Sequence, residues 1–216
     1  CMPVIQFLER DVEADDLISA VVQHQHFTEW DKVIVSSDKD FIQLCNKNTV
    51  LFRPIQEEVL TTKKVLEEYG IHPNNFAIAR SIVGDVSDNI AGVKGVGLKT
   101  VASKFAFLAE EKSYMTQDIM AFCQKQIDEG SKLKLFSNIL AEKDMVHTNY
   151  TIMQLASPNL SFQVIQKIDY AFANYIPELN LTEFKKMLME DSFAQVKFEE
   201  LFASLKKIIA EHKASC

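Results

Sequence analysis

The spacing of apolar residues changes near residue 74, and this change constrains the fold more than any other feature of the sequence. Before it, β-rich runs at Lys32 to Ser36 and Thr49 to Arg53 alternate with helical segments such as Thr61 to Tyr69, a pattern typical of an open α/β sheet. After it, nearly every segment has helical spacing. We therefore expect an α/β domain over residues 1–73 and a mainly helical region over residues 74–216.

Other segments refine this expectation. Pro3 to Phe7 is short and apolar, and it is a candidate for the first strand. The apolar residues of Ser131 to Ala141 and of Phe198 to Ile209 recur at helical spacing, which predicts amphipathic helices that pack on a core. Trp30 precedes a strand, and we expect it to be a core residue.

Composition indicates an ordinary globular chain. Hydrophobic residues make up 47% of it, and no apolar run approaches the roughly twenty residues of a membrane helix. The N-terminus lacks the layout of a signal peptide, so we expect a cytoplasmic location and no membrane partner. The four cysteines, Cys1, Cys45, Cys123 and Cys216, are scattered without a Cys-x-x-Cys pair, and we expect free thiols.

Three short clusters of acidic residues point to function. If the fold brings them together, their repulsion would exceed the stability of an ordinary domain unless divalent cations neutralise them. Each cluster also has an ordinary structural role available to it, because acids are common in helix first turns and in turns. The combination favours a metal site, and its candidate ligands are Glu13, Asp15, Asp16, Asp38, Asp40, Asp85 and Asp88.

A glycine-rich segment follows the third cluster directly. Gly92, Gly95 and Gly97 allow the backbone to approach a phosphate closely, and a helix is expected from Leu98 onward. A P-loop is excluded because Leu98 stands where lysine should follow the second glycine. The segment 89–109 contains three lysines and no acid. A helix-hairpin-helix that grips nucleic acid is therefore expected at about 82–105, although a plain glycine turn between two helices has a similar sequence.

Four motifs in this order resemble the 5′-nuclease family. That family includes flap endonucleases, the 5′→3′ exonuclease domain of bacterial DNA polymerase I, and bacteriophage RNase H and exonucleases. The motifs are Val12-Glu13-Ala14-Asp15-Asp16, Ser36-Ser37-Asp38-Lys39-Asp40-Phe41-Ile42-Gln43-Leu44, Gly84-Asp85-Val86-Ser87-Asp88-Asn89, and Gly92-Val93-Lys94-Gly95-Val96-Gly97-Leu98-Lys99-Thr100.

The resemblance implies a partial PIN-like, Rossmann-like nuclease sheet and two bound Mg²⁺ or Mn²⁺ ions. Glu13, Asp15 and Asp16 would serve mainly the first ion, and the other four acids the second. It also implies a helix-three-turn-helix that binds duplex DNA, with a K⁺ ion on its carbonyl groups. The residues expected to bind DNA are Gly92, Lys94, Gly95, Gly97, Lys99, Thr100 and Lys104.

The activity implied is hydrolysis of DNA or RNA-primer phosphodiesters at flaps, nicks or primers, during replication or repair at the nucleoid. This sequence lacks the leading strand with its aspartate, the second aspartate and the basic arch that normally begin the family's domain. We therefore expect a fragment, or an enzyme completed by a separate N-terminal chain. The competing interpretation is a noncatalytic DNA-binding module.

Overall fold

The computed structural model describes residues 2–193 and 197–215. It divides into two compact units. The larger unit covers residues 12–160, and the smaller one combines the chain up to residue 11 with the chain from residue 161. The predicted division at residue 73 falls inside the larger unit, where β-rich segments give way to helices.

A three-stranded sheet lies in the larger unit, in the order β1-β2-β3. Strands β1 (Lys32–Val35) and β2 (Thr49–Arg53) are parallel, and β3 (Glu58–Leu60) pairs antiparallel with β2. The first two strands confirm the prediction. Strand β3 was not predicted, and the strand expected at Pro3 to Phe7 is wrong, because that segment has no strand pairing.

Helices and 3₁₀ turns flank these strands. Helix α1 (Ala14–Gln23) and the turn η1 (Gln25–Phe27) precede β1. The turn η2 (Asp40–Leu44) connects β1 to β2 and buries its apolar residues against β2. Helix α2 (Thr62–Tyr69) follows β3 and confirms the helix predicted there; the Thr61 hydroxyl caps it by accepting from the Lys64 N–H.

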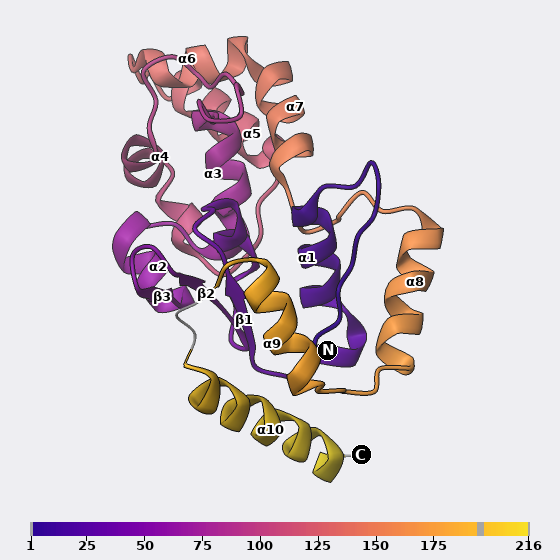
Figure 1. The fold of residues 1–216 in the computed structure, drawn as a ribbon. Helices are drawn as coiled ribbons and strands as arrows, with labels where there is room; N and C mark the ends of the chain where they lie inside the picture. The colour runs from indigo at the N-terminus through magenta and orange to yellow at the C-terminus, as the bar shows by residue number, and fades with distance from the viewer. Residues whose placement is uncertain (1, 194–196, 216) are drawn as a thin grey trace. The chain divides into compact units, whose positions relative to one another are not determined.

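The rest of the larger unit is helical. Helix α3 (Phe76–Val83) is almost entirely buried and packs against helices α4 and α7 (Figure 1). Such burial suits its sequence, in which Arg80 is the single charged residue. The remaining elements of this region are η3 (Pro73–Asn75), α4 (Leu98–Lys104), η4 (Ala106–Ala109), α5 (Thr116–Asp128), α6 (Lys134–Ala141) and α7 (Lys143–Met153).

The smaller unit contains α8 (Phe162–Ala173), α9 (Leu181–Glu190) and α10 (Phe198–Ser215). The N-terminal segment joins it through a salt bridge of 2.7 Å between Glu9 and Lys167 and an edge-to-face contact between Phe7 and Phe172. Over the described residues the fold is mixed α/β and mostly helical, with one small sheet.

Two expectations about single residues have clear outcomes. Cys45 and Cys123 are buried free thiols, as predicted, and burial raises the pKa of Cys123 to about 12; Cys1 and Cys216 lie outside the described residues. Trp30 is 53% exposed, so its assignment to the core is wrong.

Among the described helices, none is both long and apolar enough to cross a membrane.

Candidate metal centre and glycine-rich loop

The second acidic cluster lies in the turn between β1 and η2. Asp38 stabilises this turn, because its carboxylate accepts a hydrogen bond of 2.8 Å from the Asp40 N–H. The Ser36 hydroxyl in turn accepts from the Asp38 N–H at 3.1 Å. These local bonds are Asx and Ser turns, and they fix Asp40 at the start of η2, just beyond the carboxyl end of β1.

The third cluster lies in the loop that follows α3. Backbone hydrogen bonds in both directions join Asp85 to Ile90, at 2.8 and 2.7 Å, and close a tight turn. Within it the Asp85 carboxylate accepts from the Ser87 N–H at 2.8 Å and from the Ser87 hydroxyl. Asn89 has a φ of 58° and completes the turn. The turn therefore holds Asp85 and Asp88 as one structural element.

The two clusters meet in space. One carboxylate oxygen from each of Asp40, Asp85 and Asp88 lies within 4.8 Å of the others. Asp40 and Asp85 are half-buried, whereas Asp88 is exposed. An all-carboxylate group of this size matches the ligands that hard divalent cations prefer. All three residues are among the candidate ligands named from the sequence.

Arg80 pairs with two of these aspartates and was not among the predicted site residues. Its Nε donates to Asp40 at 3.1 Å, and its Nη2 makes an ion pair with Asp85. The side chain is only 12% exposed. A single arginine in an otherwise apolar helix is the sequence signal that could have revealed it, since a shielded charge requires a partner.

The pKa values of the two aspartates paired with Arg80 are shifted by different causes. Burial raises the pKa of Asp40 to about 6, because the positive charge of Arg80 only partly offsets burial and the negative charge of Asp38. Hydrogen bonds from Ser87 lower the pKa of Asp85, and Arg80 lowers it further. The pKa values of the two carboxylates are thus shifted in opposite directions.

The first cluster, on α1, approaches the other two. Burial raises the pKa of Asp15, and the negative charges of Asp38, Glu13, Asp16 and Asp88 raise it further. Asp15 therefore lies within electrostatic reach of both other clusters, and its raised pKa is a sign of a shared acidic site.

The other two acids of the first cluster are Asp16 and Glu13. The Asp16 carboxylate accepts a hydrogen bond of 3.2 Å from the Asn159 N–H. Glu13 is exposed at the N-cap of α1 and makes no capping bond with its side chain. Acids of all three clusters therefore lie within electrostatic reach of Asp15.

The segment 153–155, which we call the strap, ties the two ligand-bearing elements α1 and η2 together. From η2, the Gln43 side chain donates to the Met153 carbonyl at 3.0 Å and accepts from the Leu155 N–H at 2.7 Å. From α1, Gln23 donates to the Leu155 carbonyl at 2.9 Å, and the buried Ser19 hydroxyl donates to the same carbonyl. The strap fixes the distance between the first two acidic clusters.

The loop between α3 and α4 is held by a close approach of backbone to backbone. A β-carbon on Gly92 would lie 1.8 Å from the Val83 carbonyl oxygen and 2.6 Å from the Gly84 nitrogen. The buried Asn149 side chain donates to the Ser81 carbonyl at 3.0 Å and to the Ala91 carbonyl at 2.7 Å. Only glycine fits at position 92, which therefore has a structural role in the loop.

The far end of this loop is exposed. Gly95 has a φ of 77°, and a β-carbon on Gly95 or Gly97 would meet no atom within 4 Å. The Thr100 N–H bonds to the Gly97 carbonyl at 2.9 Å and starts α4. The three lysines predicted to bind DNA, at positions 94, 99 and 104, are exposed. The loop presents open backbone and positive charge to solvent.

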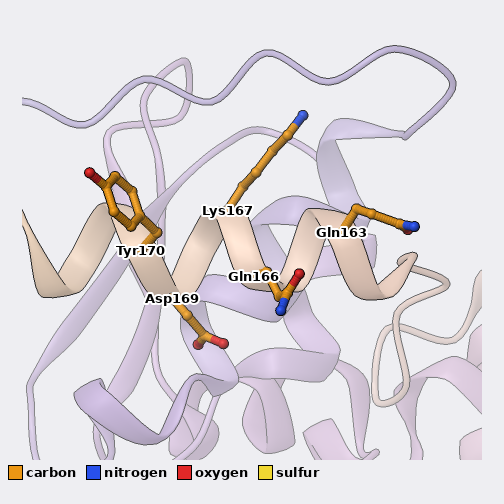
Figure 2. Close-up of a pocket in the computed structure, with 5 residues that line it drawn as sticks. All are labelled: Gln163, Gln166, Lys167, Asp169 and Tyr170. Carbon is orange, nitrogen blue, oxygen red and sulfur yellow. The ribbon is translucent and has the colours of Figure 1, made fainter.

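A surface recess of about 560 Å³ lies on α8 in the smaller unit. Figure 2 shows that its lining side chains all project from this one helix. None of them belongs to the acidic clusters or to the glycine-rich loop. The lining residues are Gln163, Gln166, Lys167, Asp169 and Tyr170.

Comparisons with known proteins agree with these features. Residues 2–70 match the family described as 5′-3′ exonuclease, N-terminal resolvase-like domain. The chain is 33% identical over 148 residues to DNA polymerase I of Caldicellulosiruptor bescii, which covers 65% of this chain and 17% of the polymerase. It is 39% identical over 89 residues to the 5′-3′ exonuclease of Buchnera aphidicola, which covers 41% of this chain and 31% of that enzyme. The chain thus spans about a sixth to a third of the length of these relatives.

Solved structures share the fold. The T5 5′-exonuclease with bound zinc superposes with a TM-score of 0.64 at 22% identity, over 78% of this chain and 62% of that one. The bacteriophage T5 flap endonuclease, in a pseudo-enzyme–product complex with DNA and metal ions, gives a TM-score of 0.61 at 22% identity, over 74% of this chain and 58% of that one. The family model over residues 2–70 and the relatives support a member of the 5′-nuclease family, and the solved structures add a shared fold.

Proposed function

We propose that this chain is the metal-binding and DNA-binding portion of a structure-specific 5′→3′ nuclease that uses two divalent cations. The observation that carries this proposal is the convergence of carboxylates from separate segments, with oxygens of Asp40, Asp85 and Asp88 within 4.8 Å of one another. Exonuclease and flap endonuclease are the names of its relatives and structural neighbours.

The residues present fit Mg²⁺ or Mn²⁺. The converging side chains are all aspartates, and hard cations favour oxygen ligands, whereas zinc favours nitrogen and sulfur. Asp38, Asp40, Asp85 and Asp88 would hold one ion, and Glu13, Asp15 and Asp16 would hold mainly the other. When bound, such ions neutralise the scissile phosphate and lower the pKa of an attacking water.

The protein's own contribution is positioning. The strap holds α1 and η2 at a fixed separation, and the turn around Asp85 presents two aspartates together. Placing reacting groups in one geometry accounts for a large part of enzymatic rate enhancement. The nuclease would thus have its acidic residues arranged before its substrate binds.

The glycine-rich loop would bind duplex DNA beside this centre. Its open backbone at Gly95 and Gly97 allows N–H groups to contact a phosphate, and Lys94, Lys99 and Lys104 add the positive charge that phosphates attract. The loop carbonyls would also suit a K⁺ ion. We propose a substrate with a 5′ flap, a nick or an RNA primer, acted on in the cytoplasm at the nucleoid.

The test is cleavage of an end-labelled 5′-flap duplex with and without Mg²⁺. We expect Asp85→Asn and Asp38→Asn to lower turnover by orders of magnitude while leaving duplex binding nearly unchanged. Asp128→Asn is the matched control, because Asp128 lies on α5, outside the acidic clusters, and accepts a hydrogen bond from Gln124 on the same helix. Cleavage by both site variants at the wild-type rate would refute the assignment.

We propose that a complementing N-terminal segment, covalent or in trans, completes the catalytic centre. The assay is therefore run with and without that segment of a relative. Mg²⁺-dependent cleavage in either arm supports the nuclease. Salt-sensitive duplex binding that ignores Mg²⁺, with no cleavage in either arm, would establish the noncatalytic DNA-binding module instead.

A further inference from the structure

Arg80 occupies the position between two of the aspartates that would bind a cation. Its Nε lies 3.1 Å from Asp40, and its Nη2 is paired with Asp85. The two aspartates come from different segments, one after β1 and one after α3. A single guanidinium therefore links the second and third acidic clusters across the site.

Both oxygens of the Asp85 carboxylate accept hydrogen bonds. One oxygen pairs with Arg80, and the other accepts from the N–H and the hydroxyl of Ser87. A carboxylate has about four lone-pair sites, so a cation that coordinates Asp85 would lie beside one of these donors. Arg80 is the donor that a cation repels, because both carry positive charge at short range in a shielded site.

We propose that Arg80 is the resident counter-ion of the metal centre, and that it is exchanged for a divalent cation when the centre fills. This inference rests on the proposed metal site and goes beyond it by assigning Arg80 a positioning role. Without metal, the guanidinium offsets the repulsion among three aspartates and keeps Asp40 close to Asp85. When a cation binds, it offsets this repulsion and holds Asp40 close to Asp85 in place of Arg80. Because the cation replaces Arg80, the arginine lowers the metal affinity of the site.

Arg53 provides a matched control for this role. Its side chain is 11% exposed, against 12% for Arg80, and it forms a salt bridge of 3.4 Å with Glu58 at the pairing of β2 with β3. Loss of either arginine removes a shielded charge of the same kind. Only the loss of Arg80 should alter the response to metal.

The experiment measures Mn²⁺ binding by calorimetry and thermal unfolding with and without Mn²⁺. We expect Arg80→Gln to lower Tm in the absence of metal, to show a larger rise in Tm with saturating Mn²⁺ than wild type, and to bind Mn²⁺ at least tenfold more tightly. Arg80→Lys keeps the charge and should bind Mn²⁺ with an affinity close to that of wild type. Arg53→Gln should show the same loss of Tm with and without Mn²⁺ and an unchanged affinity.

An Arg80→Gln variant that binds Mn²⁺ no more tightly than wild type would overturn the exchange and leave the proposed function standing. Absence of Mn²⁺ binding in wild type and variants alike would overturn both. If Arg80→Gln does not fold, the wild-type protein still decides the question. The Arg80 Nε–H resonance should shift as Mg²⁺ saturates the site, and an unchanged resonance would refute the exchange.

Discussion

The three glycines of the loop between α3 and α4 should respond differently to substitution by alanine. At Gly92 the new β-carbon would lie 1.8 Å from the Val83 carbonyl oxygen, so the backbone must move, at a cost of about 3 kcal/mol in the free energy of unfolding. At Gly95 the φ of 77° costs an L-residue about 1–2 kcal/mol. At Gly97 the φ is −120° and no atom is within 4 Å, so alanine fits there without strain. Its chain-entropy gain of about 0.4–1 kcal/mol is offset because Gly97 is the N-cap of α4, a position that favours glycine over alanine, and we expect little net change in stability.

Gly97→Ala is consequently the variant that separates folding from DNA binding. If a backbone N–H near position 97 contacts a phosphate, the added methyl group should remove that contact. A hydrogen bond to a charged group is worth about 1.5 kcal/mol, or roughly tenfold in Kd. Urea unfolding gives the stability, and fluorescence anisotropy with a labelled duplex gives the affinity. A stable Gly97→Ala variant with wild-type affinity would refute the phosphate contact, and a Gly92→Ala variant as stable as wild type would refute the packing argument.

Three further predictions concern other parts of the molecule. The Lys94→Ala, Lys99→Ala double variant should weaken duplex binding and reduce the slope of log K against log salt by about 2. Lys125→Ala on α5 should leave both unchanged. Equal slopes in the two variants would contradict DNA binding by the loop lysines. Gln43→Leu leaves the strap's backbone groups unpaired and should cost about 1–3 kcal/mol in urea unfolding; an unchanged midpoint would contradict this. Burial lowers the pKa of His72 from its ordinary value of 6.5, so the contribution of His72 to stability is present above pH 6.5 and is lost as pH falls through the folded-state pKa. His72→Asn should therefore flatten the pH dependence of Tm between pH 7 and pH 5. An unaltered pH dependence would exclude a role of His72 in acid destabilisation.

The sequence predicts those parts of the fold that depend on local pattern. β1, β2 and α2 follow from apolar spacing and from caps, whereas a site shared by Asp40 and Asp85 is what the resemblance to the 5′-nuclease family implies. β3 has only three residues and gives too short a pattern to recognise. Pro3 to Phe7 has the composition of a strand, but Phe7 instead packs on Phe172, a contact between distant segments that no local pattern indicates.

In the candidate site, too, local sequence patterns do not indicate contacts between distant segments. Acidic residues could be identified as candidate ligands because three carboxylate clusters followed by a glycine-rich segment form an ordered pattern along the chain. The sequence could mark Arg80 as a charge in an apolar helix that needs a partner, but it could not identify the partners, which lie 40 and 5 residues away along the chain. The strap is likewise invisible in the sequence, since Gln43 and Met153 are 110 residues apart. Gly92 was predicted from its motif to bind DNA, whereas its close packing on Val83 is a property of the folded backbone.

The central claim is that acids from separate segments form one site for hard divalent cations. The most direct measurement is the anomalous scattering of a crystal soaked in Mn²⁺. We predict a peak at coordination distance, about 2.1 Å as for Mg²⁺, from carboxylate oxygens of Asp40, Asp85 and Asp88. A peak bound elsewhere, or none at these aspartates at saturating Mn²⁺, would contradict the account.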